Sequence, residues 1–272
     1  MKIALGLLAL VVLGAIAYAV YAGWSFSGHA EAERQRLAAL QADAAPGVNE
    51  MPAVMRDFAL RNGGREGGPQ VIELTHEALL RMAPDQPFIE IGARQSLGTR
   101  TPSIVWTASG TMFGFVPIAA IDAYLAGEGE FEVRLAGALP VANVRGEAAA
   151  TGELLRVLSE LPVHPDAVLN MGGLTWRELD ERRIEVTASS NHGAATGIFV
   201  FDDTGDIVGF EANRPEASGA EIVDLPWRGT YGEYRQIGDY RIPTYGEAAW
   251  LRDDGPFVYW KGTVVSYAPS GR

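Results

Sequence analysis

The sequence predicts an α+β fold of mainly antiparallel β-structure: a curved sheet or half-open β-barrel with a helix packed across it, behind an N-terminal transmembrane helix. Three observations predict this fold. About twenty residues at the N-terminus are almost wholly apolar. After Pro69, short runs of β-branched and aromatic residues alternate with Gly, Pro and Asp turns, which is typical of strands. One helical pattern, residues 146–161, interrupts these runs.

The N-terminal segment predicts a membrane anchor. Ile3 to Ala22 is almost wholly apolar, and no charged residue lies between Lys2 and His29. A helix rises about 1.5 Å per residue, so this length spans a hydrocarbon core of about 30 Å. Four aromatic residues lie at its far end, where amphipathic rings favour lipid headgroups: Tyr18, Tyr21, Trp24 and Phe26. We expect residues 1–28 to be a single-pass anchor in a bacterial inner membrane, with the C-terminal domain extracytoplasmic, on the periplasmic or cell-surface side.

A cleaved signal sequence is the alternative, because Gly28-His29-Ala30 offers a small-residue cleavage pattern. The apolar region of a signal peptide normally runs for about 7 to 15 residues, which is shorter than the region found here. The retained signal-anchor is therefore favoured, and the sequence leaves the choice open.

The composition limits the partners of the domain and the means of stabilising it. The net charge is −12, and phosphate binding needs clustered Lys and Arg that are absent here, so we expect no nucleic-acid partner. The chain has no Cys, which excludes a lipidated cysteine and disulfides. The core alone must stabilise the roughly 240 residues behind the anchor, which are enough for one domain.

Two helical segments connect the anchor to the strands. Residues 29–49 predict a helical stalk or linker, helical from His29 to Asp43 and broken at Ala45-Pro46-Gly47. Met51 to Arg61 predicts a short amphipathic helix that docks on the domain. A Gly-rich loop follows it, and we place a single β-rich domain at residues 50–272.

The first part of the domain predicts five strands followed by the helix. The strands are Gln70 to Leu74, Phe88 to Gln95, Ser103 to Ser109, Phe131 to Leu135 and Leu139 to Val144. Four leucines share one face of the helix: Leu154, Leu155, Leu158 and Leu161. We expect this face to pack across the sheet, with the charged Glu153, Arg156 and Glu160 turned away from it.

The C-terminal part predicts eight strands in an antiparallel meander, because no helical crossover intervenes. They are Leu174 to Glu178, Arg183 to Ser189, Thr196 to Asp202, Ile207 to Ala212, Tyr231 to Ile237, Tyr240 to Ile242, Thr244 to Arg252 and Phe257 to Tyr267. Six Trp lie mostly at strand positions, and each buries a large area with one polar handle. A sheet curved around them either fills its concavity or leaves a ligand cavity, and the sequence does not decide which.

The common signatures of catalysis and metal binding are absent. The chain has no GxSxG, Walker A, GxGxxG or HExxH pattern. Ser189 to His192 predicts a strand end and turn, and Glu160 with His164 predicts a rim ion pair or a solvated pair. We predict no catalytic residue, metal or cofactor. The sequence leaves open whether the protein is an enzyme and favours a noncatalytic one.

Several short phrases, in their order, resemble a family of uncharacterised bacterial membrane-anchored proteins, a domain of unknown function. They are Gly92-Ala93-Arg94-Gln95, Pro102 to Ala108, Asp122-Ala123-Tyr124, Gly127-Glu128-Gly129, Gly152 to Leu161, Phe201 to Gly205, Arg241 to Thr244 and Glu247 to Trp250. The resemblance covers most of residues 50–267 and departs from the family pattern between Val71 and Ala83. It implies architecture and no catalytic residues.

The order of elements is also similar to that of periplasmic lipoprotein carriers of the Lol type, the LolA/LolB-like half-barrels. In that fold a half-open β-barrel with a helical lid holds acyl chains in an apolar hollow. This likeness of layout implies a cavity for a lipid, and it is an analogy of fold only.

Three functional hypotheses follow. The first is a membrane-tethered, noncatalytic envelope protein that binds a lipid or other apolar ligand in a β-half-barrel cavity. The second is a structural or interaction domain with a filled barrel, and the third is an envelope enzyme of unknown reaction. For the first hypothesis, polar groups beside large rings are the ligand-binding candidates: Arg94, Gln95, Trp106, Trp227, Arg241 and Trp250. The identity of the ligand and the oligomeric state stay open.

Overall fold

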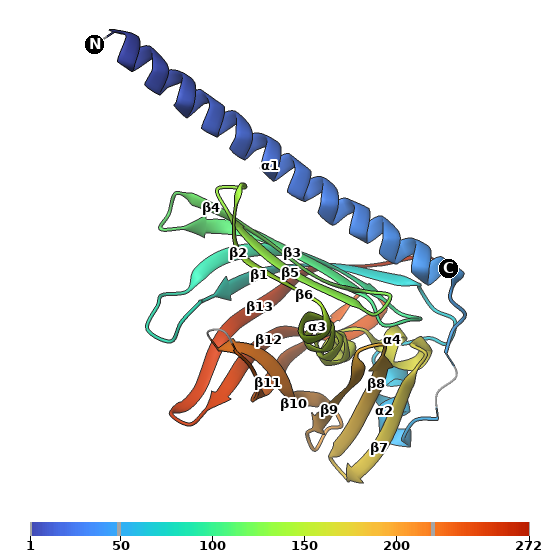
Figure 1. The fold of residues 1–272 in the computed structure, drawn as a ribbon. Helices are drawn as coiled ribbons and strands as arrows, with labels where there is room; N and C mark the ends of the chain where they lie inside the picture. Colours follow the sequence, from blue (N-terminus) through green and yellow to red (C-terminus); the bar gives the residue numbers. More distant parts are fainter. Residues whose placement is uncertain (1, 48–49, 219–220, 272) are drawn as a thin grey trace.

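A single curled sheet dominates this computed structural model, which describes residues 2–47, 50–218 and 221–271. Its thirteen strands are all paired antiparallel, in the order β6-β5-β4-β3-β2-β1-β13-β12-β11-β10-β9-β8-β7. The sheet forms a half-barrel with α3 on its concave side and α1 along its convex side (Figure 1). The predicted fold class is therefore confirmed.

The elements follow one another with few long connections. The helices are α1 (Lys2–Asp43), α2 (Ala53–Arg61), α3 (Glu147–Ser159) and α4 (Pro165–Asn170), with a 3₁₀ turn η1 (Leu161–Val163). The strands before α3 are β1 (Val71–Leu80), β2 (Ile89–Gly98), β3 (Ile104–Met112), β4 (Val116–Leu125), β5 (Glu128–Leu135) and β6 (Leu139–Arg145). The strands after it are β7 (Leu174–Asp180), β8 (Arg183–Ser190), β9 (Gly193–Phe201), β10 (Ile207–Ser218), β11 (Glu221–Ile237), β12 (Tyr240–Arg252) and β13 (Gly255–Ser270).

The first and last strands join the two parts of the sheet. β1 pairs with β2 on one side and with β13 on the other, from Val71 opposite Ser270 to Leu80 opposite Trp260. The register of the β1–β13 ladder shifts between Thr75 and His76, which leaves Val265 as an extra residue on β13. Such a bulge bends a strand and increases its twist, so it adds to the curl of the sheet.

Helix α1 is continuous from the apolar N-terminal segment to the domain. Most of its exposed apolar residues precede Ala22, and a buried stripe at helical spacing begins there: Ala22, Phe26, Ala30, Leu37 and Gln41. This stripe packs with Val105, Ile121 and Ala123 on the convex face of β3 and β4. Residues 29–43 of the predicted stalk are helical and pack on the sheet through this stripe, and residues 48–49 lie outside the described residues.

Gln41 fastens the C-terminal end of α1. Its side-chain amide donates to the carbonyl oxygen of Thr101 at 3.0 Å and to Ser103 Oγ at 2.8 Å. Its oxygen accepts the backbone N–H groups of Arg100 at 2.8 Å and Thr101 at 3.3 Å. All the hydrogen-bonding capacity of this buried side chain is therefore used at the turn between β2 and β3.

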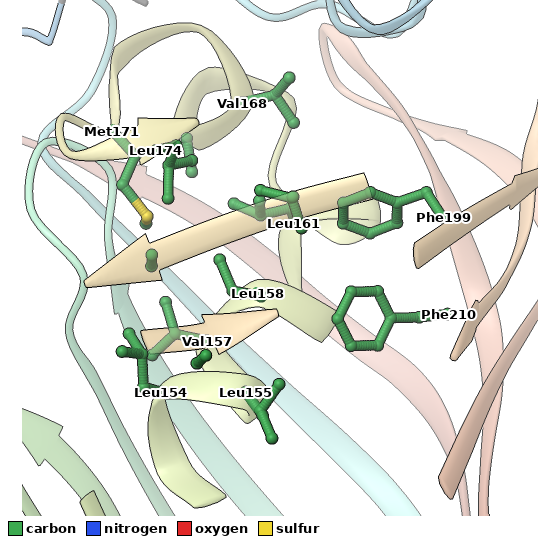
Figure 2. Close-up of a cluster of buried hydrophobic side chains, with 14 of the residues drawn as sticks. Leu154, Leu155, Val157, Leu158, Leu161, Val168, Met171, Leu174, Phe199 and Phe210 are labelled. Carbon is green, nitrogen blue, oxygen red and sulfur yellow. The ribbon is translucent and has the colours of Figure 1, made fainter. Parts of the chain in front are cut away.

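The leucine face of α3 packs on the concave side of the sheet, as predicted. Leu154, Leu155 and Leu158 lie among the aromatic side chains of the C-terminal strands, with Phe199 of β9 and Phe210 of β10 beside them (Figure 2). α3 packs against β4, β5 and β6 on one side and against β8, β9 and β10 on the other. The helix thus bridges the two edges of the half-barrel.

Three parts of the chain differ from the prediction. The strands predicted for Tyr240 to Ile242 and Thr244 to Arg252 form one strand, β12. β4 was not expected, because Val116–Leu125 is rich in Ala, contains Pro117 and does not alternate in polarity. Its second half is buried on both faces, since α1 covers one and α3 the other. The chain after α3 also stays helical: Pro162 and Pro165 stand in the first turns of η1 and α4, where a missing N–H costs nothing.

Replacing Gln41 by Ala should lower the free energy of unfolding by about 1–3 kcal/mol, because it leaves the buried groups of Arg100, Thr101 and Ser103 without partners. Denaturation of the detergent-solubilised chain measures this change. Gln35→Ala, on the exposed side of the same helix, is the matched control. Equal stability of the two variants would contradict the role assigned to Gln41.

Candidate functional site

The concave face carries two neighbouring features. The first, the charge cluster, comprises Asp122, Glu153, Arg156, Glu160 and Arg214. The second, the apolar wall, comprises Ala78, Ile91, Ala93, Trp106, Ala108 and Ile118 of strands β1 to β4, all buried. A buried charged cluster beside an apolar wall is an amphipathic environment, which a ligand with a polar and an apolar part would match.

The charged side chains of α3 face the sheet, which corrects the sequence prediction. Arg156 forms an ion pair with Asp122 of β4 and lies 3.7 Å from Glu160 Oε1. Its guanidinium also stacks over the ring of Trp106, 4.8 Å from the centroid. The prediction failed because a polar helix face was assigned to solvent, whereas α3 is enclosed on both sides by the curled sheet.

Burial controls the charge of the cluster. It raises the pKa of Glu153 well above its usual range, and the neighbouring Asp122 carboxylate and a hydrogen bond to it act in the same direction. Burial also raises the pKa of Glu160, against the opposing effects of Arg156 and of a hydrogen bond from Gln95. Burial thus favours the neutral form of both carboxyl groups, in a cluster that also holds the guanidinium groups of Arg156 and Arg214.

Gln95 connects the charge cluster to two buried histidines. Its Nε2 lies 3.1 Å from Glu160 Oε2 and 3.3 Å from His164 Nε2. Burial lowers the pKa of His164 to about 3, helped by the nearby His76. Burial and the charge of Arg156 lower the pKa of His76 to about 4. Glu160 and His164 are therefore a buried, Gln95-bridged pair, not the rim or solvated pair that the sequence predicted.

The apolar wall has small side chains at its centre. Ala93 of β2 lies directly opposite Ala108 of β3, which lies opposite Ala120 of β4. Three buried donor or acceptor atoms border this row without a hydrogen-bond partner: Nε1 of Trp106, Nε1 of Trp260 and Nδ1 of His76. Such atoms cost free energy when buried, so they are available to a ligand or an ordered water.

The structure brings four of the six predicted ligand-binding residues to the concave face. Gln95 and Trp106 are directly opposite each other in the β2–β3 ladder. Trp227 and Trp250 are opposite each other in the β11–β12 ladder. Trp227 lies under Arg214 and its Nε1 donates to the hydroxyl of Tyr259 at 3.0 Å. The two pairs lie on opposite sides of α3, in different strands of the half-barrel.

Arg94 and Arg241 do not join this face. Arg94 pairs with Glu73 at 3.0 Å and lies 3.8 Å from Glu31 of α1, so it lies at the convex side beneath that helix. Arg241 makes a bidentate ion pair with Asp206, at 2.6 and 2.7 Å, and its guanidinium lies over the ring of Tyr234. Both arginines hold elements of the fold together.

Aromatic rings fill much of the remaining concavity. Phe210 covers Gly197 and Trp260 covers Gly262, at distances where an added Cβ would collide, and Trp227 lies close over Gly229. Two pockets stand out in the described part of the chain, and neither lies on the concave face. One, of about 400 Å³, lies between α1 and strands β4 to β6 and includes His29, Glu130 and His192. The other, of about 480 Å³, borders the Gly-rich loop at residues 65–69.

No group of three or more potential metal-binding side chains occurs within residues 2–47, 50–218 and 221–271. His192 lies in the exposed turn after β8, where its backbone N–H donates to Ser190 Oγ at 3.1 Å. The turn predicted for Ser189 to His192 is confirmed. The Asp122–Glu153 carboxyl pair is sealed beneath α3 and borders neither pocket.

Sequence reasoning missed Asp122, Arg156 and Arg214 as members of the site. One signal was available: Glu153, Arg156 and Glu160 follow one another at helical spacing, so they share a face with each other. Their partners come from β4 and β10, which only the fold brings to α3.

Residues 43–262 match the model of a family of unknown function, DUF6544, which confirms the resemblance to an uncharacterised family. No curated protein matches the chain. Among solved structures, a LolA superfamily protein from Nitrosomonas europaea matches with a TM-score of 0.44 and 9% identity, over 80% of this chain and 93% of that chain.

Two further structures match at the same level. A putative outer membrane lipoprotein-sorting protein domain from Vibrio parahaemolyticus has a TM-score of 0.45 and 10% identity, over 79% of this chain and 90% of that chain. A DUF1329 family protein from Desulfovibrio piger has a TM-score of 0.43 and 8% identity, over 79% and 91%. A LolA superfamily protein is thus among the matches, as the predicted layout implied, and likeness at this level carries no function across.

Glu153→Gln should change the free energy of unfolding by less than about 1 kcal/mol, because burial and Asp122 favour the neutral form of this carboxyl group, which Gln resembles. Asp122→Asn should cost about 1.5–3 kcal/mol, because it removes the ion-pair partner of Arg156. Chemical denaturation at neutral pH compares the two variants. A larger loss for Glu153→Gln than for Asp122→Asn would show that the charges are distributed differently.

Acid should destabilise the protein through His76. Its folded pKa of about 4 lies below the ordinary 6.5, so below pH 6.5 the unfolded chain takes up a proton that the folded protein does not. This effect lowers the free energy of unfolding by roughly 2 kcal/mol between pH 7 and pH 5. Between pH 7 and pH 5, the free energy of unfolding of His76→Gln should therefore fall by roughly 2 kcal/mol less than that of the wild type. The exposed His192→Gln should show the same pH dependence as the wild type. Parallel curves for wild type and His76→Gln would refute the prediction.

Proposed function

The chain belongs to DUF6544, a family of unknown function, and we propose that it is a membrane-tethered, noncatalytic envelope protein that binds a lipid or another apolar ligand in its half-barrel. The observation that carries this proposal is the apolar wall with its unpartnered polar atoms. Ala93, Ala108 and Ala120 give the wall a smooth apolar surface. The indole N–H groups of Trp106 and Trp260 border it as free donors.

The ligand lies with its apolar part along the wall and its polar end toward the two indoles and His76. A neutral imidazole offers one donor and one acceptor, and the low pKa of His76 keeps it neutral at physiological pH. The charge cluster closes the site on the side of α3. An acyl chain fits this environment better than a polar metabolite does, since the wall is built of apolar side chains.

The tether is α1. It is the one helix in the described residues that is long and apolar enough to cross a membrane. As a retained single-pass anchor in a bacterial inner membrane, with the sheet on the extracytoplasmic side, it keeps the half-barrel next to its source of lipid. The packing of residues 22–41 on the sheet supports retention, because cleavage near residue 28 would remove Ala22 and Phe26 from the convex core.

A structural or interaction domain with a filled barrel is the second candidate. The rings of Phe210, Trp227 and Trp260 lying over glycines favour it, because they occupy concave space with the protein's own side chains. The two candidates differ in whether β1 to β3 can be reached by a ligand.

Photoactivatable fatty acid, added to the purified full-length chain in detergent, should label peptides from β1 to β3. Ala108→Phe places a ring on the wall and should reduce that labelling about tenfold, since it fills the space of the acyl chain. Ser109→Phe is the matched control, because the adjacent residue is exposed. Labelling of α1 serves as the internal standard for lipid around the anchor.

Loss of labelling in Ala108→Phe but not in Ser109→Phe would support a ligand site on the wall. An absence of concave-face labelling in the wild type, with α1 labelled normally, would favour the filled-barrel domain. Both variants keep the hydrogen bonds of the strands, and circular dichroism checks that they fold.

A further inference from the structure

We propose that the β3–β4 and β5–β6 hairpins dip their tips into the same bilayer that α1 crosses, so that the half-barrel rests on the membrane surface and does not hang free of it. The tip residues are Phe113, Phe115, Leu139 and Val141. The inference rests on the proposed function in one respect, which is the retention of α1 as a membrane anchor.

The tips expose apolar side chains to an unusual degree. Phe113 is 80% exposed and Phe115 is 76% exposed, while Leu139 and Val141 are also largely exposed. Val141 is an extra residue at the register shift between β5 and β6, which turns it out of the ladder. Neighbouring large apolar residues of this kind on one edge mark an interaction surface, because a soluble surface seldom keeps them together.

The distribution of charge distinguishes these two hairpins from others. Residues 111–121 and 135–144 contain no charged side chain, although 21% of the chain is charged. The β12–β13 turn, by contrast, carries Asp253 and Asp254. A hydrocarbon layer accepts the first two segments and excludes the acidic turn.

The backbone conformation of the two hairpin tips also favours an interaction surface there. Phe113 has φ of 53° and Ala136 has φ of 49°, each followed by a glycine with positive φ. Asn, Asp or Gly ordinarily occupies such left-handed positions, and a bulky side chain there is strained. Phe113 therefore keeps an exposed ring at a site where a polar turn residue would fit with less strain.

Continuity with α1 identifies the partner as a lipid bilayer. The turn of the β5–β6 hairpin lies against α1, since a Cβ added to Gly137 would lie 3.0 Å from the carbonyl oxygen of Ala19. The β3–β4 hairpin is next to it, because the backbone N–H of Ala136 donates to the carbonyl oxygen of Pro117 at 2.7 Å. Figure 1 shows both hairpins projecting beside α1 at the end where its N-terminal half extends past the sheet.

The level of the bilayer surface follows from α1. From residue 9 to Tyr21 its side chains are exposed apart from the half-buried Ala19, packing begins at Ala22, and Trp24 is 75% exposed beside that boundary. The stretch from Ile3 to Tyr21 matches a hydrocarbon core of about 30 Å at about 1.5 Å per residue. The surface of the bilayer thus meets α1 where the β5–β6 turn touches it. No linker separates the two, so α1 holds the base of the hairpins at the headgroups and their apolar tips within the outer part of the hydrocarbon.

The absence of Cys from the chain permits a direct test with single cysteines. Full-length variants Phe115→Cys, Leu139→Cys, Val11→Cys, Val265→Cys and Leu60→Cys would each carry a nitroxide in vesicles of phosphatidylethanolamine and phosphatidylglycerol. Collisions with oxygen and with a water-soluble nickel complex then report depth. Val265 and Leu60 are the matched controls, because both are exposed apolar residues away from the tips.

The proposal predicts that labels at residues 115 and 139 collide more often with oxygen than with the nickel complex, as the label at residue 11 does. Labels at residues 265 and 60 should collide more often with the nickel complex. Nickel-favoured collisions at 115 and 139, with residue 11 in the bilayer, would overturn hairpin insertion and leave the anchor intact. A water-exposed label at residue 11 would overturn the anchor and the hairpin insertion together. Neither result depends on whether fatty acid labels the concave wall.

Discussion

The pairing of the first strand with the last is the constraint on which the rest of the structure depends. Val71 lies opposite Ser270, so the ladder joins residues from the two ends of the domain sequence. Without it, β1 to β6 and β7 to β13 would be two separate meanders with long exposed edges, which invite association. Closing such a long loop is entropically costly, and the apolar inner faces of both parts provide the compensating burial.

The β1–β13 ladder curls the sheet, so that α3 packs against strands near both of its ends. Because the edge regions of the sheet face each other, the helix buries leucines toward β8 to β10 and charged side chains toward β4. Arg156 is acceptable there only with Asp122 and Glu160 beside it, and Glu153 only when it is neutral. A buried cluster of this kind fixes one orientation of the helix, since any rotation would leave charges unpaired.

On the convex side, the two halves of α1 have different surroundings. The helix α1 is apolar all round where no protein covers it and has a narrow buried stripe where the sheet begins. One helix therefore continues from the apolar N-terminal segment onto the sheet, and the β5–β6 turn lies against it where the packing begins.

The sequence by itself determined the local features of this protein. Period-two and period-3.6 patterns identified most strands and α3, and continuous apolarity identified the long N-terminal helix. Of the six residues predicted to bind a ligand, Gln95, Trp106, Trp227 and Trp250 lie on the concave face. β4 escaped these rules because burial on both faces removes alternation. Only the tertiary structure decided the direction of Arg156, the positions of Arg94 and Arg241 away from the concave face, and the packing of α1 on the sheet. The reason is physical: a side chain's surroundings depend on which strands the β1–β13 ladder brings together, and those contacts join residues far apart in the chain.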